Sequence, residues 1–459
     1  MLPVVARTFA RIQERLLGRR TFAILKELEE SQWWPRERIA ALQLERLQRL
    51  VASAYAHSSY WRQLMDERGI KPGDIRSLAD LKRFPLIEKS TLRDQRENMV
   101  WRQEGRRVLL ARTSGSTNDA LEFYTSSNRE ACITAARMRG HRWVGINPGD
   151  KELYFWASPV ELNTQGRLKQ IRDMLVNNPL TSTLALSPAV IPEFLKLWLR
   201  WRPKCIFTYG SSAALFARMA RSMHVDLTPL REAGLRTVIT TAEMLSDVDR
   251  GRISEAFGVP VHDSYGLREG GLIGHECDRF TMHTNDEHLI LETIDPHARM
   301  PTDGTGELVI TNLSSFVQPV IRYRTNDIVT LSQERCPCGR TLNHLRVTGG
   351  RLHDFVVTRD GRWISCVNFL YICKSVPGIL ELQVRQERLG EVHLLVVPEA
   401  DRSAGLADRI MAEARARLGP GEEITVQFVD RIEPTKSGKY RVVVSTVATQ
   451  MLADNKYTL

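Results

Sequence analysis

Arg112-Thr113-Ser114-Gly115-Ser116-Thr117-Asn118-Asp119-Ala120 follows the apolar run 108–111, which predicts a β-strand. Glycine lets a backbone approach a ligand closely, and amide and hydroxyl groups together can surround a phosphate. The lysine of the common nucleotide-binding P-loop is missing after the glycine. A cluster of Ser, Thr, Gly and Asn is also typical of turns. The stretch therefore predicts either a phosphate-binding loop or a simple turn, and the rest of the chain must decide.

Length and composition limit the classes of protein to consider. A chain of 459 residues is too long for one core, so at least two domains are expected. The 42% hydrophobic and 26% charged residues are typical of a globular protein. No apolar run predicts a transmembrane helix, and the N-terminus lacks the apolar core of a secretory signal. With seven cysteines, an odd number, we expect reduced thiols and a cytoplasmic protein.

The net charge of +10 indicates either an anionic partner or a solvated basic surface. No basic block interleaved with aromatic residues predicts a nucleic-acid groove, so we expect no nucleic-acid partner. Basic residues are in mild excess within residues 1–20, which predict a basic amphipathic helix. We expect this helix to pack on its own domain with Leu16 and Leu17 in the core; peripheral membrane contact is the alternative.

The pattern of apolar residues predicts an α/β fold. Residues 1–100 are predicted to be mostly helical, and residues 105–330 alternate short strands with helices, as in a largely parallel sheet. The predicted strands are Glu152–Trp156, Cys205–Thr208, Thr237–Thr240, Val259–Val261 and Glu307–Thr311, and the predicted helices are Ser127–Val144, Ile191–Trp201, Ala213–Met223 and Asp247–Phe257. Ligands bind beyond the carboxyl ends of such strands, a position predicted for the loop 112–120 and for the polar residues after the other strands.

Residues 350–459 predict a small α+β domain. Its predicted strands are Asp354–Thr358, Leu380–Gln386, Val392–Val397 and Ile424–Phe428, with helices near 366–375 and 404–418. The pair Gly349-Gly350 is a plausible hinge. We therefore predict a large domain over 1–349 and a small, mobile C-terminal domain over 350–459.

Two polar segments beyond the opening loop could carry chemistry. In the segment 263–269, Glu269 could bind Mg²⁺, which favours carboxylate oxygens, and Tyr265 could stack on a base. A solvated glutamate and a tyrosine in the core are the alternatives. In the segment 321–327, Asp327 could accept both hydroxyls of a ribose, or it could pair with Arg322 or Arg324.

A third polar segment, 433–441, presents Lys439 on a Ser-Gly turn near the C-terminus. A mobile lysine there could neutralise charge on a transferring group. A basic surface turn is the alternative.

The order of these motifs resembles the adenylate-forming superfamily, which includes acyl-CoA synthetases and luciferases. The segments Tyr265-Gly266-Leu267-Arg268-Glu269, Arg322-Tyr323-Arg324-Thr325-Asn326-Asp327 and Cys336-Pro337-Cys338-Gly339-Arg340 look like phenylacetate–CoA ligases. The segments 350–357 and 383–386 look like the branch associated with capsular polysaccharide biosynthesis. The resemblance covers nearly the whole chain and implies a large adenylation domain followed by a small lid domain.

The resemblance implies a role for each motif residue. The ATP phosphates would be held by Thr113, Ser114, Gly115, Ser116 and Thr117. The adenine pocket would be formed by Ala242 and Glu243, with Asp263, Tyr265 and Gly266 nearby. Glu269 would bind Mg²⁺, Asp327 the ribose, and Arg351 the ribose or phosphate. Asp354 would be the hinge, and Lys439 would stabilise the α-phosphate.

The implied reaction joins a carboxylic acid to AMP and then, by default, to CoA. Transfer to a non-CoA acceptor in surface glycan assembly and a degenerate nucleotide-binding scaffold are the alternatives. The second is motivated by Asn118-Asp119-Ala120, which replace the family's Gly-Lys-Pro and add a negative charge near the phosphates. Ala242 likewise replaces a family glycine. The resemblance also implies a dimer.

Two further sets of residues are candidates for binding. Cys277, His283, Cys336 and Cys338, with His275 in reserve, could form a closed structural zinc site; the related Cys-x-Cys-Gly-Arg element favours this, and free thiols are the alternative. The acid pocket could be lined by Phe155, Trp156, Tyr209 and Gly210, because aromatic residues favour flat apolar ligands, or these residues could belong to the core.

Overall fold

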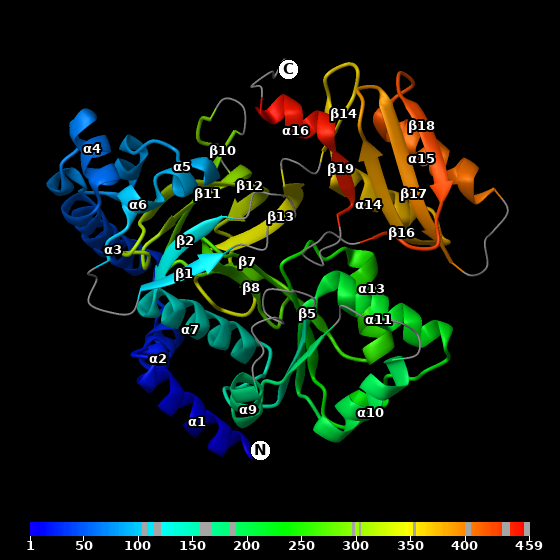
Figure 1. Ribbon diagram of the computed structural model, residues 1–459, viewed down its shortest axis with the longest axis horizontal. Coiled ribbons are helices and arrows are strands. Elements are labelled where there is room, and N and C mark those ends of the chain that lie inside the picture. Colours follow the sequence, from blue (N-terminus) through cyan, green and yellow to red (C-terminus); the bar gives the residue numbers. More distant parts are fainter. Residues whose placement is uncertain are drawn as a thin grey trace.

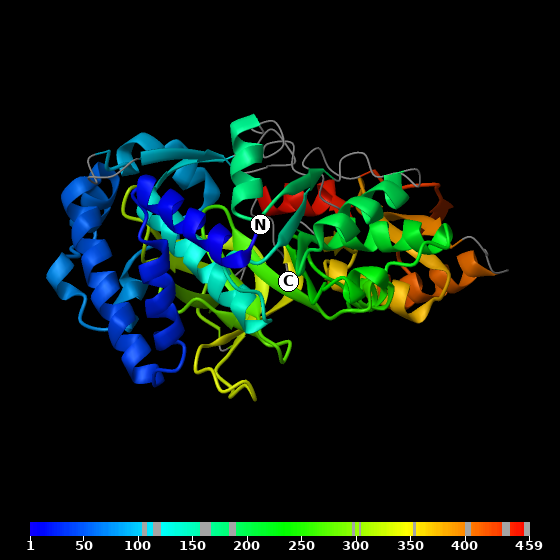
Figure 2. The ribbon, with the colours of Figure 1, turned by 90° about the horizontal axis from the view of Figure 1, so that it is seen from below.

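The structure is a computed structural model that describes residues 1–102, 108–112, 121–156, 167–182, 190–295, 299–302, 304–351, 355–399, 405–433 and 441–453. A mixed sheet of eleven strands, in the order β10-β11-β12-β13-β9-β8-β7-β6-β5-β3-β4, runs through the large part of the molecule (Figure 1). Seen from below, the N-terminal helices lie at one end and most of the C-terminal elements lie toward the other (Figure 2). The predicted α/β class is confirmed.

The N-terminal region is helical, as predicted. Its elements are α1 (Pro3–Leu16), α2 (Thr21–Ser31), α3 (Arg36–His57), α4 (Ser59–Glu67), the 3₁₀ turns Pro72–Asp74 and Leu78–Arg83, α5 (Lys89–Asp94) and α6 (Arg96–Met99). Apolar residues of α3 and α4, such as Leu47 and Trp61, pack in one core with Ile310 and Ile321 of the sheet. One prediction is wrong: Leu16 of α1 is 83% exposed and does not belong to the core.

The strand predicted before the opening loop is present as β1 (Val108–Arg112), but it does not join the large sheet. It pairs antiparallel with β2 (Glu122–Ser126), from Val108 opposite Ser126 to Arg112 opposite Glu122. The loop 113–120, which lies outside the described residues, therefore connects two antiparallel strands. The sequence had predicted that this loop follows a strand of the parallel sheet, and that prediction is wrong.

Half of the large sheet is parallel, with helices packed against it. Its strands are β3 (Glu152–Trp156), β4 (Leu180–Ser182), β5 (Cys205–Tyr209), β6 (Thr237–Thr241) and β7 (Val261–Leu267). The helices of this region are α7 (Ser127–Trp143), α9 (Arg167–Leu175), α10 (Ile191–Trp201), α11 (Gly210–Ser222), α12 (Pro229–Glu232) and α13 (Asp247–Phe257). Phe155, Trp198 and Phe216 form the aromatic centre of its core.

The other half of the large sheet is antiparallel, which the predicted alternation of strands and helices did not indicate. Its strands are β8 (Gly271–Glu276), β9 (Met282–Thr284), β10 (Leu289–Ile294), β11 (Thr305–Asn312), β12 (Val320–Ser332) and β13 (His344–Arg351). The two halves meet at β7, which pairs parallel with β6 and antiparallel with β8. Because β7 is paired on both sides, it continues to Leu267, beyond the predicted end at Val261.

The C-terminal elements form a separate four-stranded sheet, in the order β18-β17-β16-β19. The elements are β14 (Phe355–Val357), β15 (Trp363–Ser365), α14 (Cys366–Ser375), β16 (Ile379–Gln386), β17 (Glu391–Pro398), α15 (Leu406–Leu418), β18 (Glu423–Phe428), β19 (Val443–Ser445) and α16 (Thr446–Ala453). They share a core that contains Val384, Leu394 and Ile410. The exact boundary at 349/350 stays a prediction.

Two arginines connect this C-terminal sheet to the helices of the parallel half. Arg218 of α11 forms an ion pair with Glu381 of β16. Arg252 of α13 donates hydrogen bonds to the backbone oxygens of Ile379, at 3.0 Å, and Leu380, at 3.4 Å. In Figure 1 the C-terminal elements accordingly lie beside α11 and α13. No helix among the described residues is both long and apolar enough to cross a membrane.

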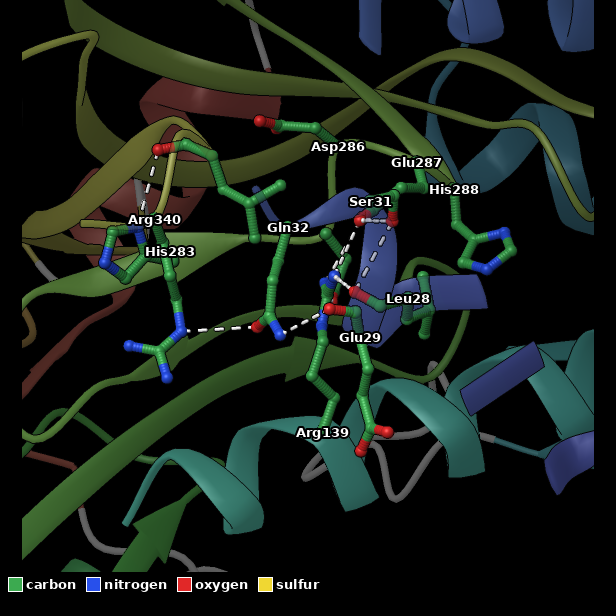
Figure 3. Close-up of polar contacts among 12 residues, drawn as sticks. Leu28, Glu29, Ser31, Gln32, Arg139, His283, Asp286, Glu287, His288 and Arg340 are labelled. Atoms are coloured by element: carbon green, nitrogen blue, oxygen red, sulfur yellow. Dashed lines mark hydrogen bonds and ion pairs between the residues drawn. The ribbon is translucent and has the colours of Figure 1, made fainter. Parts of the chain in front are cut away.

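A buried ion pair fixes α2 and α7 to the segment between β9 and β10 (Figure 3). Arg139 and Glu287 are 0% and 1% exposed, and Arg139 Nη1 lies 2.6 Å from Glu287 Oε1. Ser31 also donates to this carboxylate, at 2.6 Å, and Arg139 donates to the backbone oxygen of Leu28. Burial raises the pKa of Glu287, but Arg139 and Ser31 outweigh it and hold this pKa below its usual value.

We predict that Glu287→Leu lowers the free energy of unfolding by about 3–5 kcal/mol, because it leaves the Arg139 charge buried without its carboxylate. Urea unfolding followed by circular dichroism measures the loss. The double variant Arg139→Met/Glu287→Leu should recover most of it, since both charges are then removed. Glu30→Leu, at an exposed site on α2, is the control and should unfold like the wild type. A single variant no less stable than the double variant would contradict the prediction.

Candidate active site

The carboxyl ends of three parallel strands form one edge of the large sheet. Tyr209, the last residue of β5, is opposite Thr241, the last residue of β6, and Thr241 is opposite Ser264 in β7. The predicted site residues Gly210, Ala242–Glu243 and Tyr265 directly follow these three positions. The strand register therefore brings them to the same edge, where ligands of α/β proteins bind.

Glu243 is held at the start of helix α11. Its Oε2 accepts a hydrogen bond from the backbone N–H of Ser211, at 3.0 Å. A carboxylate is stabilised at this position by the partial positive charge of a helix N-terminus. Ala242 before it has φ = 67°, in the left-handed region that favours glycine. The alanine thus keeps the backbone conformation expected of the glycine that it replaces.

Tyr265 and Asp327 are brought together across the sheet. The Tyr265 hydroxyl donates a hydrogen bond to Asp327 Oδ2. Asp327 in β12 is the register partner of Arg351 in β13, so the backbones of these two predicted site residues are adjacent. Gly266 follows Tyr265 at a register shift between β7 and β8. Residues predicted to contact the base and the ribose are therefore neighbours.

Glu269 lies in the turn between β7 and β8 and is held from two sides. Its Oε1 accepts a hydrogen bond from the Tyr323 hydroxyl, at 2.7 Å. Arg129 of α7 donates to the backbone oxygens of Arg268 and Glu269, both at 2.7 Å. Arg129 is 1% exposed, and burial lowers its pKa although neighbouring carboxylates oppose this. A carboxylate fixed in this way suits Mg²⁺, which binds few protein oxygens and keeps the rest for water or phosphate.

Asp263, in β7, is a carboxyl group with a raised pKa. Burial, together with the nearby carboxylate of Glu276, raises the pKa of Asp263 to about 7. Its Oδ1 accepts a hydrogen bond from the Thr240 hydroxyl, at 2.7 Å. Glu276 itself accepts two hydrogen bonds from Arg250 of α13, both at 2.8 Å. Asp263 therefore carries a proton in part of the molecules near neutral pH and can donate a hydrogen bond as well as accept one.

Both arginines of the Arg-Tyr-Arg motif form ion pairs with carboxylates. Arg322 lies 3.1 Å from Glu292, and Arg324 lies 2.6 Å from Glu307 and 3.0 Å from Glu88. Glu307 is completely buried. These pairs fix strand β12 on both sides of Tyr323.

The four predicted pocket residues face different environments. Phe155 is 1% exposed and packs against Trp198 and Phe216 in the core between the sheet and the helices. Trp156, the next residue in the strand, contacts Tyr209, with ring centroids 4.5 Å apart. Because successive side chains of a strand point to opposite faces, Trp156 and Tyr209 share the face away from that core, whereas Phe155 does not. Gly210 begins helix α11.

The predicted zinc ligands converge. One ligand atom each from Cys277, His283, Cys336 and Cys338 lies within 4.8 Å of all the others. The sulfurs of Cys277 and Cys336 are 3.8 Å apart, and His283 Nε2 is 3.2 Å from Cys338 Sγ. Four such ligands at these separations suit a tetrahedral Zn²⁺. His283 Nδ1 lies 3.4 Å from the Leu342 backbone oxygen, which orients the ring with Nε2 toward the sulfurs.

The reserve ligand His275 is not part of this group. Its ring packs directly on α7, where a Cβ atom at Gly140 would lie 2.5 Å from His275 Cγ. Its Nδ1 faces the backbone oxygen of Glu276, at 2.8 Å.

Some predicted site residues lie outside the described part of the chain. They are Thr113–Thr117 with 118–120, the hinge residue Asp354, the lysine Lys439 and the side chain of Arg351. Two residues of the site were missed in the sequence. Tyr323 had a signal, since it lies between two arginines of a quoted motif, but Arg129 looks like any arginine of a helix.

Comparison with known proteins supports the family that the motifs predict. Residues 356–446 match the family model of the CapK C-terminal domain. The phenylacetate–coenzyme A ligase of Thermus thermophilus is 28% identical over 445 residues, covering 89% of this chain and 97% of the relative. Protein CapK of Staphylococcus aureus is 21% identical over 419 residues, covering 88% of this chain and 89% of the relative. The predicted resemblance to phenylacetate–CoA ligases and to the capsular branch is confirmed.

Solved structures agree on the fold. A crystal structure of 2-hydroxyisobutyryl-CoA ligase in the postadenylation state, in complex with R3-HIB-AMP, matches with a TM-score of 0.74 at 21% identity, covering 92% of this chain and 94% of that chain. The same ligase in the thioesterification state, with 2-HIB-AMP and CoA, matches with a TM-score of 0.59 at 22% identity, covering 93% and 95%.

We predict that the purified chain contains one zinc ion per molecule and that Cys336→Ser loses it, because a hydroxyl is a far weaker ligand than a thiolate. Metal analysis by mass spectrometry measures the stoichiometry. Cys132→Ala is the matched control, since Cys132 is a buried cysteine of α7 outside the group. Absence of zinc from the wild type would contradict the site.

Proposed function

We propose that this chain, a relative of the phenylacetate–CoA ligases, activates a carboxylic acid with ATP and then transfers the acyl group to CoA. In the first step a carboxylate oxygen attacks the α-phosphorus of ATP, giving acyl-AMP and pyrophosphate. In the second step the thiol of CoA attacks the acyl carbon, giving the thioester and AMP. The observation that carries the proposal is the grouping of motif residues: Glu243 and Tyr265 follow paired positions of the neighbouring strands β6 and β7, and Tyr265 is hydrogen-bonded to Asp327.

The described residues would bind and orient ATP. Asp327 would accept the ribose hydroxyls in place of the Tyr265 hydroxyl, which leaves the Tyr265 ring beside the base. Glu243, held by the start of α11, would line the adenine pocket. Asp263, protonated in part of the molecules, would be able to donate a hydrogen bond to an acceptor of the base.

Charge is the main obstacle to the first step, because a carboxylate must approach a polyanion. Glu269 would hold Mg²⁺, which when bound supplies positive charge to the phosphate oxygens. Arg129 and Tyr323 would keep the Glu269 carboxylate in place. Lys439 would neutralise the charge that develops at the α-phosphate.

We further propose that residues 350–459 form a domain that rotates between the two steps. Support comes from the polar contacts of Arg218 and Arg252 with β16, since such contacts between domains can break and form again. The higher TM-score to the postadenylation structure than to the thioesterification structure agrees with a chain seen in the first arrangement. Asp354 next to Gly349-Gly350 would be the pivot.

An acceptor other than CoA is the second candidate. The match of residues 356–446 to the CapK C-terminal domain favours it, because that region would contact the acceptor in the second step. A degenerate scaffold is a third candidate, motivated by Asp119. Structural zinc, bound magnesium, a dimer and a cytoplasmic location remain parts of this proposal.

We predict that the wild type releases pyrophosphate with at least one acid of a panel that includes phenylacetate, 2-hydroxyisobutyrate and anthranilate. If CoA is the acceptor, adding CoA should increase turnover and produce a thioester detectable by mass spectrometry. Acyl-AMP that accumulates unchanged with CoA would favour the second candidate, and no pyrophosphate with any acid would favour the scaffold.

Asp327→Asn should raise the KM for ATP by about 10–100-fold, the effect of one lost charged hydrogen bond. Glu334→Gln, at an exposed residue just after β12, is the control.

We predict that Lys439→Ala abolishes formation of acyl-AMP but leaves part of the second step, because Lys439 acts only at the α-phosphate. The first step is measured by pyrophosphate release, and the second with chemically synthesised acyl-AMP and CoA. Lys436→Ala, in the same segment, is the control. Equal losses in both steps would contradict the assignment of Lys439.

A further inference from the structure

Helix α1 presents its apolar residues to solvent. Starting at Leu2, directly before the helix, apolar residues follow along one face at intervals of three or four positions. Their exposed fractions are 73% for Leu2, 41% for Val5, 41% for Phe9, 50% for Ile12 and 83% for Leu16. The helix lies at the surface, along the lower edge in Figure 1 and on the near side in Figure 2. Single exposed apolar residues are common, but a continuous stripe along a helix marks an interaction surface.

The face of α1 that contacts the protein is small and polar. Ala6 and Glu14 are its buried residues. Next to Gln13 and Glu14 lies a cavity of about 100 Å³, lined also by His141 and Glu152. A helix that covers a soluble domain normally turns its apolar stripe inward. Helix α1 instead turns its apolar stripe outward, so contacts other than burial of the stripe must hold the helix in place.

Backbone contacts hold the first turn of α1 instead. A Cβ atom at Gly149 would lie 2.2 Å from the Pro3 backbone oxygen, so only glycine permits this approach. Asn177 donates hydrogen bonds from Nδ2 to the backbone oxygens of Met1, at 3.2 Å, and Gly149, at 2.8 Å. The helix is therefore seated with its apolar stripe outward by specific contacts.

The charge around the stripe is almost entirely positive. The first twenty residues contain five arginines and a single acidic residue, Glu14, which is buried and bonded to Thr21 and Arg19. Within the described part of the chain, no carboxylate pairs with Arg7, Arg11 or Arg15. A hollow at the end of the helix, beside Leu16 and Leu17, is lined by Arg15, Arg19 and Arg20.

We infer that α1 is an interfacial anchor that lies in the plane of a bilayer containing anionic phospholipids. The apolar stripe would enter the boundary between headgroups and acyl chains, and the arginines would contact the lipid phosphates. A second copy of this chain fits the face less well, because a two-fold contact would bring arginines of one helix against those of the other. This inference concerns a surface away from the sheet edge and does not depend on the proposed reaction.

Vesicle flotation of the full-length chain tests the inference. Binding is expected to vesicles of phosphatidylcholine with about 30% phosphatidylglycerol and to fall several-fold with phosphatidylcholine alone or in about 0.5 M salt, which screens the arginines. The variant Ile12→Ser/Leu16→Ser should lose at least about tenfold in partitioning, since it removes two apolar side chains from the stripe. Arg11→Glu/Arg15→Glu should lose the preference for phosphatidylglycerol.

A matched variant tests whether vesicle binding depends on the stripe of α1 or on exposed apolar residues in general. Ile171→Ser/Leu197→Ser removes two comparably exposed apolar residues of α9 and α10 and should bind vesicles like the wild type. Sedimentation velocity of the same proteins tests whether a second copy of this chain covers the stripe instead. The inference is overturned if the wild type does not float with the anionic vesicles, if the matched variant loses binding equally, or if Ile12→Ser/Leu16→Ser converts a soluble dimer to a monomer.

Discussion

The pairing of strand β7 on both sides is the constraint on which the candidate site depends. Its parallel register with β6 aligns Ser264 with Thr241 and, through β5, with Tyr209. Its antiparallel pairing with β8 then forms the turn that carries Glu269. Strand β7 therefore connects the edge formed by the parallel strands to the hairpin turn that carries Glu269. A shift of one residue in this register would turn Tyr265 away from Asp327, because neighbouring side chains of a strand point to opposite faces.

The site also depends on buried arginines that hold its backbone in place. Arg129 holds backbone oxygens of the Glu269 turn, and the Arg324–Glu307 and Arg322–Glu292 pairs hold β12. Buried pairs of this kind add little net stability, because removing both charges from water costs much of what their attraction gains. Their contribution is geometric: a guanidinium with several fixed donors allows few alternative positions. Glu269 and Asp327 are in this way placed before any ligand binds.

The local sequence pattern predicted the bounds of several helices well, but it predicted poorly which elements pair or pack with one another. The predicted bounds Ile191–Trp201 and Asp247–Phe257 coincide with α10 and α13, because apolar periodicity and the turn residues around them are local signals. The predicted end of β7 was wrong, because the polar residues Asp263 and Ser264 continue the strand through their pairing with β6 and β8. The convergent group of three cysteines and His283 was predicted from residue type and resemblance, whereas Arg129 and the outward stripe of α1 become visible only when the helices are placed in three dimensions.

The contacts of Arg252 have a consequence for how such proteins diversify. This arginine binds the backbone oxygens of Ile379 and Leu380, not their side chains. Backbone oxygens are present whatever residues occupy β16, so substitutions there leave these two hydrogen bonds in place. The Arg218–Glu381 pair, by contrast, requires a particular side chain on β16, and Arg252 also lies 3.7 Å from Glu399, directly after β17. The hydrogen bonds from α13 to the C-terminal sheet therefore tolerate sequence change in β16, whereas the ion pair from α11 does not.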